Sequence, residues 1–391
     1  MLNFPNITVK DFLTNYWQKN FLIIPDAIPG FINPVSPDEL AGLALEEEIE
    51  SRMVFQTPGE DLSWSLKRGP FTADIFTKLP PTHWTLLVQG VDRFVPEVAS
   101  LLDHFNFLPQ WRVDDVMISY AVKNGSVGPH YDNYDVFLYQ AKGRRKWLLT
   151  TIGCTEDNYQ EGLDLRIMKE FKTEHEFILE EGDMLYLPPH VAHHGISLSE
   201  DCLTYSFGYR SYQGQELWDS FGEYLAANNK QSLLYIDPDW SKINNTSEIP
   251  EQAWLQAKKT MQAILSDDRQ IKSWFAAFST SLDSQAESVL PIPDEDEETI
   301  SVEQFKEELR SSTGIIRNAV CRFAYFCEGD SLKLYINGCN WPIGNADTDF
   351  IKDLANKRHL LVNELEIYID NQANLTLLYD LWLLEWLDLL D

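Results

Sequence analysis

The sequence has no long apolar run. No apolar stretch approaches the roughly 18 residues that a membrane-spanning helix needs. The first residues, MLNFPNITVKDFLTNYW, contain acids and amides where a signal peptide needs a basic start and an apolar stretch. We therefore expect a cytoplasmic protein that does not enter a membrane.

Cysteine is also scarce. The 391 residues include five cysteines, an odd number without a Cys-x-x-Cys pair, so neither a disulfide framework nor a zinc ribbon is indicated. We interpret each as a small buried apolar residue. They are Cys154, Cys202, Cys321, Cys327 and Cys339.

The sequence has few basic residues relative to its acidic ones. Lysine and arginine number 31 against 61 aspartates and glutamates, which gives a formal net charge of −30. Such a chain repels phosphate backbones, so we expect no direct DNA binding. A partner drawn by the overall field should be basic, which favours a basic protein.

What the sequence does contain is ample material for cores. The hydrophobic fraction is 44%, with twelve tryptophans and sixteen tyrosines, and the length exceeds that of one ordinary core. We predict an α+β chain of successive parts: a barrel domain over 1–212, a helical module over 213–285, an acidic linker over 286–299 and a winged-helix-like domain over 300–391.

The barrel is predicted from a change of pattern near residue 115. The chain before about residue 110 mixes helical segments and loops, such as a helix over 36–50 with a capping signal at Ser36. Short apolar stretches then follow, separated by turn signals such as Asn124-Gly125, which is typical of an antiparallel barrel such as a double-stranded β-helix. The stretches are 116–122, 136–140, 146–151, 176–179, 184–187 and 203–209.

The second half of the sequence has a mainly helical pattern. After residue 210, aromatic residues at helical spacing, such as Trp218, Phe221 and Tyr224, indicate the helical module. In the last part we predict a helix from the capping box at Ser301, a hairpin of 322–327 with 331–336, and a helix over 348–358. Helices that flank a hairpin suggest a winged helix.

One triplet suggests a metal site. His130 and Asp132 form the chain's only His-x-Asp/Glu triplet, and residues two apart on a strand project to the same face. Non-haem Fe(II) oxygenases use two histidines and one carboxylate, which leaves positions for 2-oxoglutarate and O₂. Taken alone, the triplet is weak evidence for a metal, because it arises by chance in an acid-rich chain and a buried His–Asp pair can be purely structural.

A second histidine ligand is expected further along the chain. The segment after the Gly182-Asp183 turn, MLYLPPHVAHHG, offers His190, His193 and His194. Prolines 188 and 189 end a strand and stiffen the approach to these residues. His193 and His194 would face opposite ways in an extended chain, so at most one of the two can join the metal.

A basic residue should hold the distal carboxylate of 2-oxoglutarate. In Gly143-Arg144-Arg145-Lys146-Trp147, strand alternation places Arg145 and Trp147 on one face, and Arg144 and Lys146 on the other. A guanidinium binds a carboxylate through a bidentate, charge-assisted pair. The alternative is that all three basic residues are solvated.

At these segments the sequence resembles the JmjC-type ribosomal oxygenases, over about half the chain. The resemblance lies in residues 84–89 (WTLLVQ), 111–119 (WRVDDVMIS), 128–137 (GPHYDNYDVF), 143–147 (GRRKW) and 182–189 (GDMLYLPP). It implies that His130, Asp132 and His193 bind Fe(II) and that Arg145 meets the C5 carboxylate of 2-oxoglutarate. The family commonly has other residues at the positions of His190 and His194.

The resemblance also implies an architecture and an activity. The architecture is a JmjC barrel, a helical dimerisation module that forms a homodimer, and a C-terminal winged helix. The activity is hydroxylation of an arginine in a basic large-subunit ribosomal protein, the sixteenth in bacterial numbering. Asp114, Asp115 and Asp135 could meet such an arginine near the barrel mouth. A histidyl hydroxylase and a non-catalytic cupin-like scaffold are the alternatives.

Overall fold

The computed structural model describes residues 1–57, 63–228, 233–241, 245–293, 299–329 and 331–390. Its contacts divide the chain into two compact units. The first comprises Met1–Ser211, Leu282–Cys321 and Asn345–Asp391, and the second comprises Tyr212–Ser281 and Arg322–Gly344. Among the described residues, no helix is both long and apolar enough to cross a membrane.

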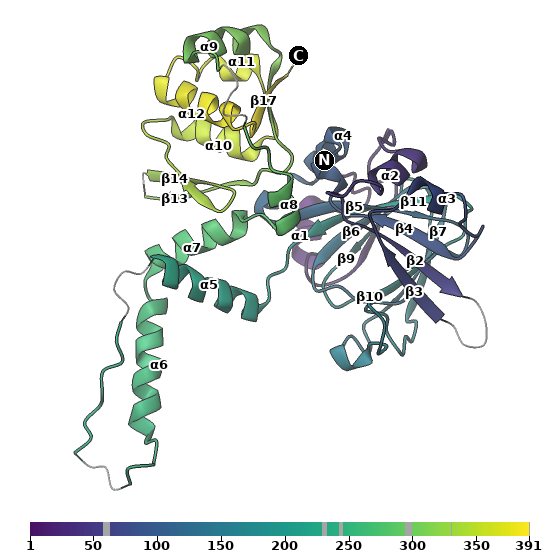
Figure 1. The fold of residues 1–391 in the computed structure, drawn as a ribbon, viewed down its shortest axis with the longest axis horizontal. Helices are drawn as coiled ribbons and strands as arrows, with labels where there is room; N and C mark the ends of the chain where they lie inside the picture. The colour runs from purple at the N-terminus through teal and green to yellow at the C-terminus, as the bar shows by residue number, and fades with distance from the viewer. Residues whose placement is uncertain (58–62, 229–232, 242–244, 294–298, 330, 391) are drawn as a thin grey trace. The chain divides into compact units, whose positions relative to one another are not determined.

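The first unit contains the predicted barrel, which is built from two antiparallel sheets (Figure 1). The larger sheet has the order β1-β9-β6-β11-β5-β4-β2-β3, and the smaller has the order β10-β7-β8. Their bounds are β1 Leu22–Ile24, β2 Ser51–Thr57, β3 Ser63–Arg68, β4 Trp84–Val88, β5 Val113–Ala121, β6 Asp135–Lys142, β7 Arg145–Thr150, β8 His175–Leu179, β9 Met184–Leu187, β10 Ala192–Ser197 and β11 Cys202–Tyr209.

Short helices accompany the strands of this part. The α-helices are α1 Val9–Asn15, α2 Pro37–Leu43, α3 Ala73–Phe76 and α4 Pro96–Leu101, and the 3₁₀ turns are η1 Val91–Arg93, η2 Leu102–Phe105, η3 Gln110–Arg112 and η4 Glu156–Asn158. The capping box at Ser36 is confirmed, since Ser36 and Glu39 each bond the backbone of the other. The predicted helix over 36–50 is wrong in length, because α2 ends at Leu43 and the chain turns before β2.

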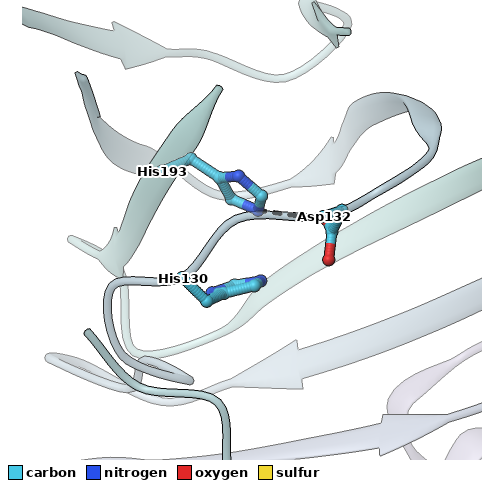
Figure 2. A group of neighbouring side chains, drawn as sticks. All are labelled: His130, Asp132 and His193. Carbon is cyan, nitrogen blue, oxygen red and sulfur yellow. Dashed lines mark ion pairs between the residues drawn. The ribbon is translucent and has the colours of Figure 1, made fainter. Parts of the chain in front are cut away.

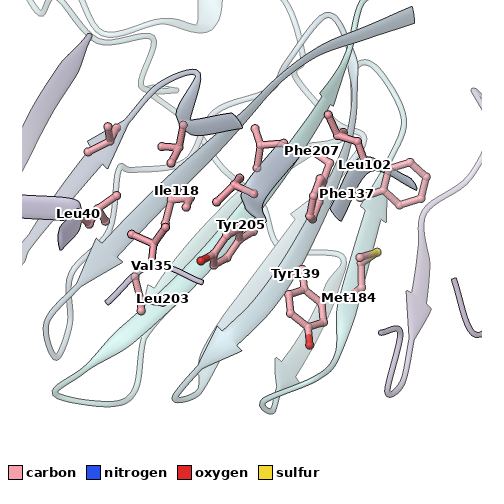
Figure 3. Close-up of a cluster of buried hydrophobic side chains, with 14 of the residues drawn as sticks. Val35, Leu40, Leu102, Ile118, Phe137, Tyr139, Met184, Leu203, Tyr205 and Phe207 are labelled. Atoms are coloured by element: carbon pink, nitrogen blue, oxygen red, sulfur yellow. The ribbon is translucent and has the colours of Figure 1, made fainter. Parts of the chain in front are cut away.

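The larger sheet places its core on one face. Alternate residues of β11, namely Leu203, Tyr205, Phe207 and Tyr209, lie with Phe137 of β6 in one apolar cluster (Figure 3). Residues of α1, α2 and α4 belong to the same cluster, so these helices cover that face. Each large side chain buried in this way contributes about 1.5–3 kcal/mol. The opposite face of the sheet is left for the barrel interior.

A second cluster lies inside the barrel. Val136 and Leu138 of β6, with Leu185 and Leu187 of β9, pack with Trp147 and Leu149 of the smaller sheet. β7 pairs with β10 in a register that sets Trp147 opposite Gly195 and Leu149 opposite His193. The two sheets therefore enclose an interior to which β7 and β10 contribute the residues singled out in the sequence.

The six predicted barrel stretches are confirmed as β5, β6, β7, β8, β9 and β11, with shifts of up to three residues. The strands β2, β3 and β4 were not predicted. β2 and β4 lie inside the sheet, between other strands, and all five residues of β4 are buried, so no alternation of apolar and polar residues marks that strand. β10 was also missed, because its HHG sequence has little strand propensity.

The first unit also holds most of the C-terminal part. Its elements are α8 Ser284–Ser288, α9 Val302–Ser311, β12 Gly314–Arg317, α10 Thr348–Asn356, β16 His359–Leu361, α11 Val362–Leu365, α12 Gln372–Leu383 and β17 Leu387–Leu390, with β12 between β16 and β17. The predicted capping box at Ser301 is confirmed. Of the predicted linker 286–299, residues 286–288 belong to α8, and residues 294–298 lie outside the described residues.

The second unit combines helices with the predicted hairpin. Its elements are α5 Gly214–Asn228, α6 Glu251–Leu265, α7 Asp268–Thr280, β13 Phe323–Glu328, β14 Ser331–Ile336 and β15 Cys339–Trp341. The backbone N–H of Gly338, beside the sheet, donates to the Thr280 hydroxyl of α7 at 3.1 Å. The hairpin thus packs with these helices, whereas the predicted domain 300–391 groups it with the C-terminal helices.

All five cysteines are free thiols. Cys202 and Cys321 are buried and Cys154 is half-buried, whereas Cys327 and Cys339 are exposed. The interpretation of every cysteine as a buried residue is therefore wrong for Cys327 and Cys339, which lie in the β13-β14-β15 sheet.

Candidate metal and cosubstrate site

Three side chains predicted to bind a metal lie together (Figure 2). His130, Asp132 and His193 each offer one ligand atom, and these atoms all lie within 4.8 Å of one another. The imidazole centroids of His130 and His193 are 4.2 Å apart, and His193 Nε2 lies 3.7 Å from Asp132 Oδ2. Within the described ranges, no other group of three histidine, cysteine or acidic side chains meets this criterion.

Backbone pairing brings these residues together. His130 and His193 form an isolated antiparallel bridge, in which each N–H donates to the other's carbonyl at 3.0 and 2.7 Å. The carbonyl of Asp132 accepts from the N–H of His190 at 2.9 Å. These bonds hold the loop that carries Asp132 against the segment 190–193, at His130 and at Asp132 itself.

Each imidazole is oriented by a backbone carbonyl. His130 Nδ1 lies 2.9 Å from the carbonyl of Gly128, and His193 Nδ1 lies 3.2 Å from that of Val191. A carbonyl can only accept, so Nδ1 is the donor in both rings, and Nε2 is the atom left to bind a metal. Carbonyls that hold the remote nitrogen are the usual support of metal-binding histidines.

The protonation state also suits a metal ligand. Burial lowers the pKa of His193 to about 4, and the neighbouring His130 lowers it further than Asp132 raises it. His193 is therefore neutral at neutral pH, which is the form that binds metals. Two imidazoles and one carboxylate are the donor set of non-haem Fe(II) oxygenases, so the residues present fit Fe(II).

The other two histidines of the segment lie elsewhere. His194 projects from the opposite face of β10, where its ring lies 6.5 Å from Trp64 and 6.1 Å from Phe171. His190 is exposed and adopts a positive φ of 64°. Of the three candidates, only His193 meets His130 and Asp132, which agrees with the alternation argument.

Arg145 is the second notable feature of the site. Its residue is 4% exposed, and its Nε and Nη2 have no hydrogen-bond partner in the described parts of the chain. Arg144 points outward instead and pairs with Glu180 at 2.9 Å. An uncompensated buried charge is costly, so Arg145 requires an anionic partner. The distal carboxylate of 2-oxoglutarate fits that requirement.

The predicted substrate acids do not all face the site. Asp135 is fully buried at the start of β6, where it accepts hydrogen bonds from Tyr186 Oη at 2.6 Å and from Gln18 Nε2 at 3.0 Å, and pairs with Arg112 at 3.2 Å. Asp114 pairs with Arg210 at 2.9 Å. Asp135 therefore anchors neighbouring elements, and the suggestion that it meets a substrate arginine is wrong.

Asp115 is an acid whose pKa is strongly raised. It is buried on β5 and accepts from Gln89 Nε2 at 2.7 Å and from the N–H of Gly90 at 2.8 Å. Burial raises its pKa to about 7, and the nearby carboxylates of Asp92 and Asp114 act in the same direction. A cation that approached this carboxylate would favour its ionised form.

The approach to His130 depends on a glycine that the sequence did not single out. Gly128 has a φ of +84°, and a Cβ there would lie 3.0 Å from Ile167 Cδ1 and Cγ1. Ile167 belongs to the loop between β7 and β8, whose Met168 N–H donates to the carbonyl of Pro129 at 2.8 Å. Close packing of this loop therefore sets the position of His130.

We expect Gly128→Ala to weaken metal binding and to destabilise the protein by about 1–3 kcal/mol, because it adds a strained φ and a clash two residues before His130. Gly162→Ala is the matched control, since Gly162 has a φ of +77° but nothing within 4 Å of its Cβ position. Urea unfolding and Mn(II) titration measure the two effects. Equal metal affinities for the two variants would show that the loop does not position His130.

Comparison with known proteins finds similar chains. The JmjC domain family model matches residues 100–217. The ribosomal protein uL16 3-hydroxylase of Escherichia coli (strain K12) is 36% identical over 277 residues, which is 71% of each chain. A probable ribosomal oxygenase of Haemophilus influenzae is 29% identical over 94% of each chain.

Solved structures extend the similarity to the whole chain. The ribosomal oxygenase YcfD of Escherichia coli, in complex with cobalt and 2-oxoglutarate, matches with a TM-score of 0.82 and 29% identity. The match covers 100% of this chain and 99% of the other. A further structure of the same protein, in complex with cobalt and succinic acid, matches equally well.

Proposed function

The chain belongs to the JmjC-domain ribosomal oxygenases, and from this premise we propose that it is an Fe(II)- and 2-oxoglutarate-dependent protein hydroxylase that acts on an arginine of ribosomal protein uL16, the sixteenth protein of the large subunit. The observation that carries the proposal is the cluster of His130, Asp132 and His193 in the same barrel as a buried Arg145, whose Nε and Nη2 have no hydrogen-bond partner among the described residues.

The roles of the residues follow from their geometry. His130 and His193 would bind Fe(II) through Nε2, and Asp132 through its carboxylate. Fe(II) supplies the oxidative decarboxylation of 2-oxoglutarate to succinate and CO₂, by which one oxygen atom of O₂ enters a C–H bond of the target and the other enters succinate. Arg145 would hold the C5 carboxylate, and the apolar residues of the interior exclude water.

The proposed substrate agrees with the chain's charge. A protein with a net charge of −30 attracts basic partners, and ribosomal proteins are basic because they bind RNA. The uL16 assignment rests on the relative from Escherichia coli. The experiment is succinate release from 2-oxoglutarate with Fe(II), with and without uL16. Release that uL16 stimulates supports a hydroxylase, whereas no release in either case favours a non-catalytic scaffold.

We also propose that the helical module forms a homodimer. Helix α6 has no buried residue, although it carries large apolar side chains. Trp254, Leu255, Met261 and Leu265 are 51%, 44%, 45% and 42% exposed. An apolar face of this kind on a helix marks an interaction surface, and a second copy of the chain is the partner we propose.

We expect light scattering at micromolar concentration to give the mass of a dimer. Replacing Trp254 and Leu255 together by glutamate should shift the mass to that of a monomer, because it places charges on the apolar face. Lys259→Glu, at an exposed position on the same helix, is the control and should leave the dimer intact. A monomeric wild-type chain would remove the proposal.

A further inference from the structure

Trp147 lies between the two functional groups of the proposed site. Its ring centroid is 5.8 Å from that of His193 and 5.7 Å from the Arg145 guanidinium carbon. Arg145 and Trp147 point to the same side of β7, and Trp147 is 4% exposed. The ring therefore lies close both to His193, a proposed metal ligand, and to Arg145, the proposed carboxylate anchor.

A glycine makes this position possible. Gly195 of β10 lies opposite Trp147, and a Cβ at Gly195 would lie 2.6 and 2.7 Å from ring atoms Cζ3 and Cη2. Any other residue would push the ring into the barrel interior. The close approach of β10 to the indole thus fixes the ring between His193, two residues before Gly195, and Arg145.

Among the residues that the structure describes, none accepts a hydrogen bond from the indole N–H of Trp147. Trp147 Nε1 is buried without a hydrogen-bond partner, as are Nε and Nη2 of Arg145. The ring packs among valine and leucine side chains, which cannot accept a hydrogen bond. Buried indole N–H groups usually find an acceptor. The Trp147 ring lies 5.7 Å from the Arg145 guanidinium carbon, so an anion bound by Arg145 is the acceptor that these donors share most readily.

We propose that Trp147 is a further cosubstrate-binding residue, whose indole N–H donates to the 2-oxoglutarate carboxylate that Arg145 holds. The inference rests on the proposed function and deepens it. The alternative is that Trp147 only fills the core. A core tryptophan would affect metal and cosubstrate binding equally through stability, whereas a donor affects the cosubstrate alone.

The test is calorimetric binding of 2-oxoglutarate to the Mn(II)-loaded full chain, without turnover. Trp147→Phe keeps a ring but removes the N–H, so the Kd of 2-oxoglutarate should rise by about tenfold or more, as for a lost hydrogen bond to a charged group. The Kd of Mn(II) should not change. Trp382→Phe, whose indole packs on Phe305 far along the sequence, is the control and should leave both constants unchanged.

The outcomes separate the inference from the proposed function. An unchanged Kd for Trp147→Phe beside a large rise for Arg145→Ala would overturn the inference and leave the proposed function intact. Equal weakening of Mn(II) and 2-oxoglutarate, with a lower Tm, would show a packing role and also overturn it. Unchanged binding in both variants would remove the proposed anchor itself.

A measurement on the wild-type chain covers the case in which Trp147→Phe does not fold. In the ¹⁵N–¹H spectrum of the Zn(II)-loaded protein, 2-oxoglutarate should shift an indole resonance strongly downfield, because a new acceptor deshields the proton. The exchange of this indole proton with solvent should become slower at the same time. No indole shift at saturating 2-oxoglutarate would overturn the inference.

Discussion

Asp132→Ala and, separately, His193→Ala are expected to abolish the conversion of 2-oxoglutarate to succinate. Each variant removes one of the three ligand atoms that lie within 4.8 Å of one another. With two ligands left, the site would lack one of the three donors that non-haem Fe(II) oxygenases use, so it would not support the reaction. The measurement is succinate release at saturating Fe(II) and 2-oxoglutarate, beside Mn(II) affinity.

The fold should survive both substitutions. The core of the barrel lies in apolar clusters that do not include these residues, so circular dichroism and the Tm of the apo-protein should stay near wild type. His194→Ala is the matched control, because His194 is the next residue on β10 but faces Trp64 and Phe171. An active His193→Ala beside an inactive His194→Ala would show that the third ligand is assigned to the wrong histidine.

Arg145→Ala is expected to raise the KM for 2-oxoglutarate by well over tenfold, whereas Arg144→Ala should change it little. Removing one partner of a buried, charge-assisted pair costs about 2–5 kcal/mol. Arg144 is paired with Glu180 at the surface, and exposed pairs contribute about 1 kcal/mol or less. Titration of 2-oxoglutarate in the succinate assay gives both constants.

Lysine at position 145 should rescue binding in part. It restores the positive charge but lacks the planar fork that matches a carboxylate with two parallel hydrogen bonds. Since Arg145 Nε and Nη2 have no partner in the described structure, Arg145→Ala should not lower the Tm through a lost ion pair. Near-wild-type KM values for both alanine variants would place the carboxylate anchor on another strand.

The sequence predicts the chemical part of the site well, for a local reason. The spacing of His130 and Asp132, and the alternation that separates Arg145 from Arg144, need only a few residues of extended chain. The same alternation allowed only one of His193 and His194 to join the metal, and the resemblance to the JmjC-type ribosomal oxygenases selected His193. A short segment of sequence is therefore enough to predict which residue types could bind the metal and which side chains share one face of a strand.

The parts that could not be predicted depend on residues far apart in sequence. The close approach of Gly195 to Trp147 exists only because β10 pairs with β7 in one register. The role of Gly128 depends on a loop that begins more than twenty residues later and places Ile167 against it. The hairpin of β13 and β14 packs with α7, and no local sequence pattern predicts which helices a hairpin contacts.

The central claim is that this chain hydroxylates ribosomal protein uL16, and intact-mass measurement of uL16 tests it directly. Purified chain, Fe(II), 2-oxoglutarate and O₂ are incubated with uL16, and Asp132→Ala serves as the inactive control. We predict a mass increase of one oxygen atom with the wild type only, located on an arginine by fragmentation. An unchanged mass of uL16, under conditions in which the chain still converts 2-oxoglutarate to succinate, would contradict the claim.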